Sequence, residues 1–381
     1  MSEQFIPIND ALNSILQKRK DDNLYRTLQV NDSLIDFCSN DYVSFARSVE
    51  LKDKVKNIAA TFEHLSGATG SRSISGNTSY AEDLEKQLAT FHHAEAGLLF
   101  NSGYDANIGL FSCIAKKEDT IICDELIHAS IIDGCRLSYA NRFKFAHNDV
   151  SDLEKKLQHA KGTVFVAVES VYSMDGDMAP LKEIAALCKR YNANLIIDEA
   201  HATGVFGDHG RGLANQLGVE QDAFARVHTF GKGIGCHGAI VLGNEVLRSY
   251  LINFARSFIF TTALPVHSLI TIKCAYDHMA SDDFYNGHLH RMIHHFKNNF
   301  NGNEPIHLIE SSTPIQCVVI PGNEKVKRIA KQLQDNGFDI RAIVNPTVPV
   351  GKERLRISLH IHNTLEEVDA LLMVLHQIIN Q

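Results

Sequence analysis

Short, continuously apolar segments alternate with amphipathic stretches through the middle of the chain. From about Glu95 onward these segments are GLLF, TIICD, VFVAVES, NLIIDEA, RVHTFG and AIVLG. A strand that helices cover on both faces is apolar at every position, whereas a half-exposed strand alternates apolar and polar residues. The pattern therefore predicts an α/β fold with a mostly parallel sheet.

The two ends of the chain show different patterns. The segment NDALNSILQKRKDD predicts an N-terminal helix, and LQVNDSLIDFCS predicts a short strand pair after it. After about Ser281 the chain becomes richer in His and Asn and contains PIQCVVI, FDIRAIV and RLRISLHI with helical stretches between them. We therefore expect an N-terminal segment at residues 1–45, a large domain at 46–280 and a smaller α+β domain at 281–381.

Composition narrows the class of protein. The chain has 381 residues, 44% of them hydrophobic, which is enough to bury a large core. A net charge of -8 argues against nucleic acid or an acidic membrane surface as the main partner. The eight cysteines form no CxxC pair, which favours free thiols in a reducing compartment over disulfides or a zinc site. Without a signal-like N-terminus or a membrane-length apolar run, we expect a cytoplasmic protein.

The twenty histidines suggest a metal site only in HLHRMIHH, where His290 and His294 would lie one helical turn apart. Two imidazoles without a third ligand or a nearby carboxylate make a weak site, and a solvated helix explains the same residues. We therefore predict no metal.

A single lysine, Lys232, stands among five glycines in HTFGKGIGCHGAIVLG, residues 228–243. A phosphate-binding P-loop would need Gly where Arg226 stands and Ser or Thr where Gly233 stands. The GxGxxG match is followed by a strand, not a helix, and Phe258 takes the place of the required acid. Two interpretations remain: an amine nucleophile that a flat ligand can approach, or a surface lysine in a turn.

Other chemically active residues fall where predicted strands end, which is where ligands gather in parallel sheets. Glu169 and Ser173 follow VFVAV, Asp198 and His201 follow NLII, and Lys232 follows VHTF. Ser102, Gly103 and Tyr104 precede a predicted helix whose free N–H groups suit a phosphate, and His128 lies at another strand-to-helix junction. A lysine, an acid, an aromatic ring and a phosphate-binding helix together are what pyridoxal phosphate requires.

Nine motifs, in order and spread over nearly the whole chain, resemble those of the α-oxoamine synthases among the fold-type I pyridoxal phosphate enzymes. They are SNDYVSF, GATGSRSISGN, FNSGYDAN, DELIHAS, ESVYSMDGDMAPL, IIDEAHATGVFGDHGRG, HTFGKGIGCHGAIV, FIFTTALP and NPTVPVGKERLRISL. The resemblance implies a cofactor, pyridoxal 5'-phosphate, and a homodimer with shared active sites. It also implies condensation of an amino acid with an acyl thioester of coenzyme A or an acyl carrier protein, with loss of carbon dioxide.

The resemblance also implies roles for individual residues. Lys232 would bind the cofactor covalently and transfer protons, Asp198 would keep the pyridine nitrogen protonated, His201 would bind the phenolic oxygen, and His128 would stack on the ring. The other residues implied for the cofactor are Ser102, Gly103, Tyr104, Thr229 and Ser173, with Thr261 or Thr262 reaching the phosphate from the partner subunit. Those implied for the substrate are Arg356, which would bind the amino-acid carboxylate, Asn40 and Ser71.

Each role has a structural alternative. Asp198 could cap a helix, either histidine could be an ordinary core imidazole, and Arg356 could be a charge at a strand end. The chain also departs from the family pattern at DYVSF and at GATGSR, where Thr69 replaces a glycine and could narrow the acyl channel.

The GSR region, Ser71 and the compact N-terminus resemble the branch that uses L-alanine and a pimeloyl thioester. Glycine or serine with another acyl donor, as in glycine C-acetyltransferase and serine palmitoyltransferase, remain alternatives, as does a non-catalytic cofactor-binding subunit.

Overall fold

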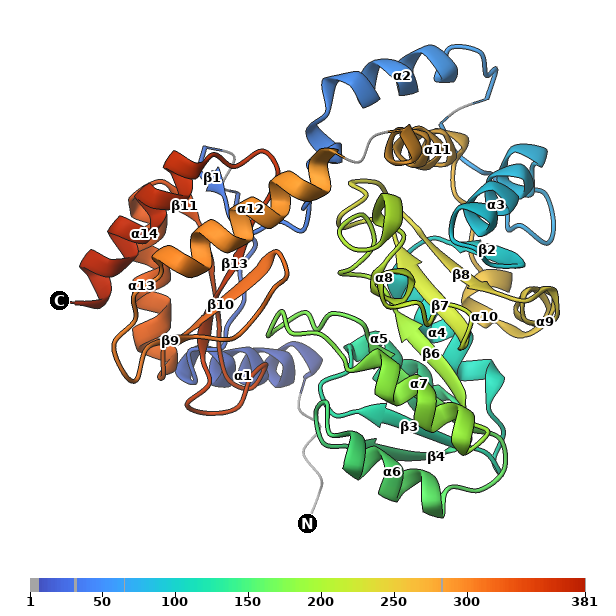
Figure 1. Cartoon of the computed structure of the whole chain (residues 1–381), viewed down its shortest axis with the longest axis horizontal. Helices are drawn as coiled ribbons and strands as arrows, with labels where there is room; N and C mark the ends of the chain where they lie inside the picture. The colour runs from blue at the N-terminus through green and yellow to red at the C-terminus, as the bar shows by residue number, and fades with distance from the viewer. Residues whose placement is uncertain (1–6, 31–32, 65, 282–283, 381) are drawn as a thin grey trace. The chain divides into compact units, whose positions relative to one another are not determined.

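The computed structural model describes residues 7–30, 33–64, 66–281 and 284–380 (Figure 1). By its internal contacts the chain divides into a first unit, residues 1–34, and a second unit, residues 35–381. The first unit contains α1 (Ile8–Asp21), which confirms the predicted helix and has no buried side chain. The domain boundaries expected at residues 45 and 280 stay a prediction.

A seven-stranded sheet forms the centre of the second unit, with the strand order β2-β8-β7-β6-β5-β3-β4. The strands are β2 (Ala96–Phe100), β3 (Thr120–Asp124), β4 (Asn141–Phe145), β5 (Val164–Glu169), β6 (Asn194–Asp198), β7 (Ala223–Thr229) and β8 (Ala239–Gly243). Only β8 runs antiparallel to its neighbours in this sheet, so the prediction of a mostly parallel sheet is confirmed. The sequence pattern did not predict the edge strand β4, because four of its five residues are exposed.

Both faces of this sheet are covered, which explains the continuous apolar segments. On one face Ile121 and Ile196 share a buried cluster with side chains of α4 (Gly103–Ile114) and α5 (Ala129–Leu137). On the other face Ile122 and Ile197 pack with α6 (Val150–His159) and α7 (Leu181–Arg190). Successive residues of one strand therefore enter opposite cores, and neither can be polar without a cost.

The remaining helices of the large sheet region lie mostly near its β2 end (Figure 1). They are α2 (Val49–Ala59), α3 (Ser79–Phe91), α8 (Leu213–Leu217), α9 (Glu245–Phe254), α10 (Arg256–Ile259) and α11 (Val266–Ser281). Side chains of α2, α3 and α11 share a third buried cluster with Leu99 and Ile240 of the sheet.

The C-terminal part is built on a four-stranded antiparallel sheet, in the order β12-β13-β10-β9. Its elements are α12 (Phe284–Asn299), β9 (His307–Leu308), β10 (Ile315–Val319), α13 (Asn323–Asp335), β11 (Phe338–Asp339), β12 (Arg341–Ile343), β13 (Arg354–Ser358) and α14 (Leu365–Ile379). The α+β character predicted for this part is confirmed.

The strand pair predicted around residues 28–39 is wrong for the described part of that segment. It contains one strand, β1 (Ile35–Asp36), and this strand pairs in parallel with β11, about 300 residues away in sequence. Local alternation of apolar and polar residues shows that a strand forms but does not identify its partner.

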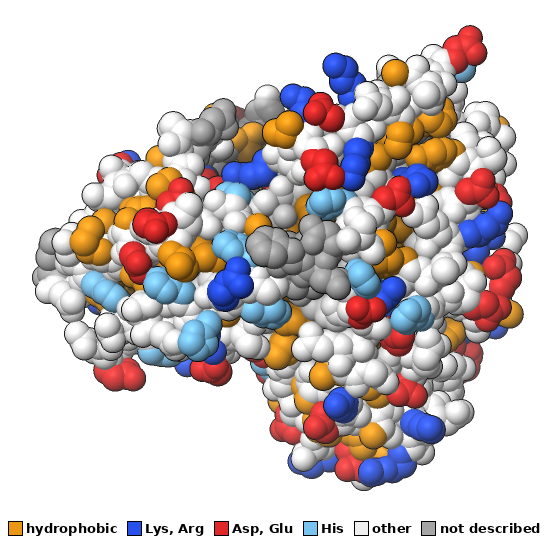
Figure 2. Space-filling model, turned by 45° about the horizontal axis from the view of Figure 1, so that its top comes forward, with side chains coloured by type: hydrophobic (Ala, Val, Ile, Leu, Met, Phe, Trp, Pro, Cys, Tyr) orange, Lys and Arg blue, Asp and Glu red, His pale blue; other side chains and the backbone are white. Residues whose placement is uncertain are grey.

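The cysteines and the surface charges agree with what the composition of the chain indicates. All eight cysteines are free, and five of them are buried. Among the described residues, no helix is long and apolar enough to cross a membrane. On the face drawn in Figure 2, acidic and basic side chains are interspersed and do not gather into one basic patch.

Candidate active site

The carboxyl ends of β5, β6 and β7 bring the predicted residues together. Asp198 is the last residue of β6, and its backbone is the register partner of Glu169 at the end of β5. Lys232 lies in the glycine-rich turn that joins β7 to β8. Parallel strands place their carboxyl ends at one edge of the sheet, so residues far apart in sequence converge there.

The amine of Lys232 is half-buried, and its Nζ lies 3.0 Å from Nε2 of His201. Burial lowers the pKa of Lys232, although the nearby carboxylates of Asp198 and Glu169 oppose this shift. Burial also holds the pKa of His201 well below its usual value, and the positive charges of Lys232 and Arg356 add to the effect. A lysine with a lowered pKa is a better nucleophile at neutral pH, as the Schiff-base hypothesis requires.

Two N–H donors fix the carboxylate of Asp198, which is 5% exposed. Its Oδ1 accepts a hydrogen bond of 2.9 Å from the backbone N–H of Ala200, and its Oδ2 accepts one of 2.8 Å from Nδ2 of Asn107. The structure therefore holds this carboxylate in one orientation inside the site.

His128 caps the N-terminus of α5, and its Nδ1 accepts a hydrogen bond from the backbone N–H of Ser130 at 3.2 Å. The Ser130 hydroxyl lies 2.7 Å from the same nitrogen and accepts a hydrogen bond from Asn107 Nδ2. His128 as a whole residue is exposed, although part of its ring is buried. Burial of part of the ring and the Lys232 charge lower the pKa of His128, which favours its neutral form.

The residues predicted to hold a phosphate lie at the N-terminus of α4. Ser102 is the N-cap residue and α4 begins at Gly103, so Gly103 and Tyr104 form the first turn of the helix and do not precede it as predicted. A Cβ atom on Gly103 would lie 3.1 Å from Oγ1 of Thr229, so the N-terminus of α4 approaches the Thr229 hydroxyl closely. Tyr104 is exposed, and its hydroxyl donates a 2.6 Å hydrogen bond to Asp133.

Arg356 reaches this region from β13 of the smaller sheet and is 8% exposed. Its Nε donates a 2.7 Å hydrogen bond to the backbone carbonyl of Ser173, and its Nη2 donates one of 3.0 Å to Oδ1 of Asn40. The predicted carboxylate-binding arginine, the predicted substrate-contacting asparagine and Ser173 are therefore adjacent.

The other predicted residues form a separate group. Nδ2 of Asn101 donates hydrogen bonds of 3.0 Å to Oγ1 of Thr261 and 2.9 Å to the carbonyl of Thr262. The loop that carries Ser71 joins them through a 3.0 Å bond from the Ala263 N–H to the carbonyl of Gly70. Within the described residues, no hydrogen bond links Ser71, Thr261 or Thr262 to Lys232.

Glu169 is a buried acid that the sequence placed at a strand end without a role. It is 2% exposed, and its Oε1 has no hydrogen-bond partner among the residues that the structure describes. Burial and the neighbouring charge of Asp198 raise its pKa to about 8, while Lys232 opposes this shift.

Sequence reasoning missed two residues that the structure places within the site. Tyr42 has no exposed surface, and its hydroxyl lies 2.7 Å from Nδ1 of His201. Asn107 is 2% exposed and bonds Asp198. Both lie inside motifs that carry the family resemblance, SNDYVSF and FNSGYDAN, so the signal was present without an assigned role.

A possible ligand cluster for a metal lies elsewhere, at Asp36, His360 and His362. However, Oδ2 of Asp36 already bonds the guanidinium of Arg47 at 2.9 Å, and Nδ1 of His360 lies 3.0 Å from Asn363. A cation beside the carboxylate disfavours a metal ion, so we assign none to this cluster.

The two histidines considered for a metal in the sequence lie exposed on α12, as the solvated-helix alternative expects. The absence of a metal remains a prediction.

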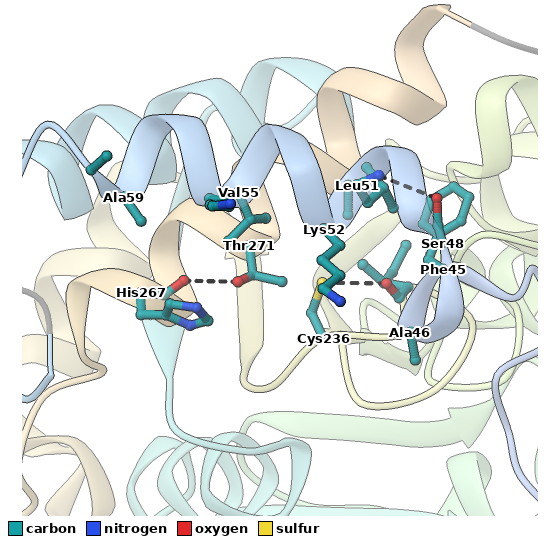
Figure 3. Close-up of a pocket in the computed structure, with 15 residues that line it drawn as sticks. Phe45, Ala46, Ser48, Leu51, Lys52, Val55, Ala59, Cys236, His267 and Thr271 are labelled. Carbon is teal, nitrogen blue, oxygen red and sulfur yellow. Dashed lines mark hydrogen bonds between the residues drawn. The ribbon is translucent and has the colours of Figure 1, made fainter.

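A groove of about 580 Å³ lies beneath α2, beside α11 and the turn that follows Lys232 (Figure 3). Most of its lining is apolar, and the side chain of Lys52 descends from α2 toward Cys236. Lys232 and Asp198 do not line this groove, so it is distinct from the candidate active site.

The residues of the site fit pyridoxal phosphate. The buried amine of Lys232 can hold its aldehyde carbon, the fixed carboxylate of Asp198 can face its pyridinium nitrogen, and the Gly103–Thr229 cradle suits its phosphate. The unpaired Oε1 of Glu169 is a further buried polar atom without a partner in the protein. The fold and this site define a fold-type I pyridoxal phosphate-dependent transferase.

Comparison with known proteins agrees with this class. The family model described as "Aminotransferase class I and II" matches residues 32–375. The chain is 41% identical to an 8-amino-7-oxononanoate synthase of Emericella nidulans, over 96% of this chain and 94% of the relative. It is 38% identical to one of Marinobacter nauticus, over 94% of each chain.

Among solved structures, serine palmitoyltransferase from S. paucimobilis is similar with a TM-score of 0.88 and 27% identity, covering 97% of this chain and 96% of that one. An 8-amino-7-oxononanoate synthase from Francisella tularensis is similar with a TM-score of 0.78 and 28% identity, covering 92% and 98%. The chain belongs to the aminotransferase class I and II family, within its α-oxoamine synthase branch.

Proposed function

We propose that this protein condenses L-alanine with a pimeloyl thioester, carried by coenzyme A or an acyl carrier protein. The products are 8-amino-7-oxononanoate, carbon dioxide and the free thiol, in a step of biotin biosynthesis. The observation that carries the proposal is the convergence of Lys232, Asp198 and Arg356 in a chain that is 36–41% identical to synthases of that name.

Lys232 anchors the cofactor and then moves a proton at the amino acid. Pyridoxal phosphate supplies an electron sink that stabilises negative charge at the Cα atom of the bound amino acid. Lys232 has a pKa lowered by burial, so its free amine can accept the Cα proton at neutral pH. Asp198 would face the ring nitrogen, and two N–H donors hold its carboxylate in place.

Arg356 and Asn40 orient the amino acid. A guanidinium binds a carboxylate through two parallel hydrogen bonds, which fixes direction as well as position. The Ser173 carbonyl and the Asn40 amide oxygen hold the guanidinium at 2.7 and 3.0 Å, so Arg356 is oriented before the substrate arrives. His128 covers the ring from the α5 side, and Ser102, Gly103, Tyr104 and Thr229 hold the phosphate.

The active unit in this proposal is a homodimer in the cytoplasm. Thr261 and Thr262 bond Asn101 and not the Lys232 group, and Asn101 directly precedes the phosphate cradle. That these threonines serve a neighbouring subunit's phosphate is what the family resemblance implies. Ser71 lies on the loop bonded to the same segment and would help the site select alanine.

A steady-state assay tests the substrate pair. The purified protein is supplied with alanine, glycine or serine, each crossed with pimeloyl, acetyl and palmitoyl thioesters, and product formation is measured. The proposal expects the highest kcat/KM for alanine with the pimeloyl thioester. A higher value for serine with the palmitoyl thioester would favour a serine palmitoyltransferase, and no turnover with any pair would favour a non-catalytic subunit.

A further inference from the structure

The hydroxyl of Tyr42 lies at a junction of three polar side chains. It is 2.7 Å from Nδ1 of His201, 3.0 Å from Oδ1 of Asn40 and 3.3 Å from Nη2 of Arg356. The tyrosine ring has no exposed surface, so these contacts are made away from bulk water. A hydroxyl carries one proton, so it can donate to only one of these neighbours at a time.

The distances fit an assignment of the protons in which the donors form one continuous series. Lys232 reaches Nε2 of His201 with an amine that donates hydrogen bonds, so Nε2 accepts. A neutral imidazole then carries its proton on Nδ1 and donates it to the oxygen of Tyr42. Tyr42 in turn donates its own proton to Oδ1 of Asn40.

When the cofactor binds, Nε2 of His201 must donate a hydrogen bond instead of accepting one. This step rests on the proposed function. The phenolic oxygen assigned to His201 is negatively charged, so Nε2 must become a donor. A neutral imidazole then has a lone pair on Nδ1, which requires a donor in its turn. The hydroxyl of Tyr42 is the group that the structure places there.

We propose that Tyr42 is a positioning residue whose hydroxyl turns from Asn40 to His201 when the cofactor binds, and so holds His201 as a donor to the phenolic oxygen. The turn leaves no buried polar atom without a partner. Nη2 of Arg356 donates to both Oδ1 of Asn40 and the oxygen of Tyr42, and these two bonds remain after the hydroxyl proton moves. An unpaired buried group would carry a penalty, and this arrangement avoids it.

The protons balance in this change. The ammonium of Lys232 gives one proton to Nε2 and becomes the free amine that binds the cofactor. Nδ1 passes its proton to the oxygen of Tyr42, and the tyrosine releases its own proton past the half-buried Asn40 to solvent, so the imidazole remains neutral. The tyrosine carries one proton before and after the change, and only the direction in which it donates differs.

The surroundings keep His201 neutral, so its imidazole carries a single ring proton, on either Nδ1 or Nε2. Burial lowers the pKa of the imidazole, and the positive charges of Lys232, Arg356 and His128 lower it further. The acidic groups Asp198 and Glu169 act on Lys232, where they oppose the lowering of its pKa. The titratable and charged groups facing this part of the site are Tyr42, His128, Glu169, Asp198, Lys232 and Arg356.

The test uses the holoenzyme and the visible absorbance of its bound cofactor, titrated with pH. The change Tyr42→Phe removes the hydroxyl and keeps the ring that fills the core. A weaker donor at the phenolic oxygen leaves more negative charge on it, and that charge raises the proton affinity of the adjoining imine nitrogen. The midpoint of the titration should therefore rise by about half to one pH unit, the equivalent of one hydrogen bond.

Tyr276→Phe is the matched control. Tyr276 is 1% exposed, and its hydroxyl lies 2.9 Å from Nε2 of His92, so this change deletes another buried tyrosine–histidine bond outside the site. It should lower the melting temperature as Tyr42→Phe does without moving the absorbance midpoint. Equal midpoints in wild type and Tyr42→Phe, or equal shifts in both variants, would overturn the inference.

A second measurement reads the wild type directly and uses a variant only to assign signals. Long-range ¹⁵N spectra of histidine-labelled wild type report which nitrogen of each imidazole carries the proton. The His201 signals, assigned by their loss in His201→Asn, should show a proton on Nδ1 without the cofactor and on Nε2 with it. The same tautomer in both states would overturn the inference. A wild type that binds no pyridoxal phosphate at Lys232 would instead contradict the proposed function.

Discussion

Asn107 donates a hydrogen bond from Nδ2 to Oδ2 of Asp198 over 2.8 Å, inside a site where both residues are almost fully buried. The bond crosses from α4 to the end of β6, and so it joins the helix proposed to hold the phosphate to the acid proposed for the ring nitrogen. The phosphate and the ring nitrogen of one cofactor would therefore be held by parts of the fold that are tied directly to each other.

Asn107→Ala should lower activity by about 10- to 100-fold, because losing one hydrogen bond to a buried charge costs about 1 to 3 kcal/mol. The visible absorbance of the bound cofactor should also shift. Asn194→Ala is the control, since Asn194 lies at the opposite end of β6, where its Nδ2 bonds the carbonyl of Val164 at 3.1 Å. Equal activities in the two variants would contradict the role of Asn107.

Lys232 should carry the cofactor. Borohydride reduction of the purified protein, followed by digestion and mass spectrometry, should place a pyridoxyl group on this lysine and on no other. Lys232→Ala should give protein without the covalent adduct, because alanine has no amine to attack the aldehyde. An adduct mapped to another lysine would refute the assignment of the site.

Arg356→Ala should mainly raise the KM for the amino acid. Losing a charge-assisted pair with the carboxylate costs about 1.5 to 3 kcal/mol, which corresponds to roughly 10- to 100-fold in binding. Arg341→Ala is the control, because Arg341 is the register partner of Arg356 on the neighbouring strand and bonds Asp339. A normal KM for alanine in Arg356→Ala would exclude the proposed carboxylate site.

His147 should contribute stability that disappears at high pH. Its Nδ1 lies 2.9 Å from Asp124 and its Nε2 lies 2.7 Å from Asp177. Burial alone would lower its pKa, but these two carboxylates outweigh burial and raise the pKa to about 9. Because this value lies above the unfolded one, the contribution is complete below about pH 6.5 and is lost as the pH rises through 9.

Urea unfolding of wild type and His147→Gln checks this expectation. The difference in unfolding free energy should be about 1 to 3 kcal/mol at pH 6 and should shrink markedly at pH 10. A difference that stays constant over this range would show that His147 acts only through packing.

Shared active sites predict complementation between two inactive variants. Lys232→Ala lacks the amine, and a Thr261→Ala, Thr262→Ala double variant lacks the hydroxyls proposed to reach the partner's phosphate. Co-expressed heterodimers contain one site with both features intact, so they should regain part of the activity. Mixed dimers as inactive as their parents, or a fully active monomer in sedimentation at assay concentration, would exclude sites shared through these threonines.

The sequence by itself determined the class of the fold and most of the candidate site. Strands covered on both faces must be apolar throughout, so β3, β5 and β6 were visible as continuous segments, and chemically active residues at their ends marked the edge where ligands bind. Asp198, His201 and Lys232 could be predicted together because the carboxyl ends of parallel strands meet at one edge.

Only the tertiary structure decided which atoms touch. The pairing of β1 with β11 and the contact of Tyr42 with His201 join segments about 300 and 159 positions apart, and no local pattern encodes the partner of such a contact. Strand β4 was missed because an exposed edge strand need not be apolar. Asn107, Tyr42 and Glu169 owe their importance to burial beside charged or polar groups, and burial of a polar side chain depends on what the rest of the chain packs around it.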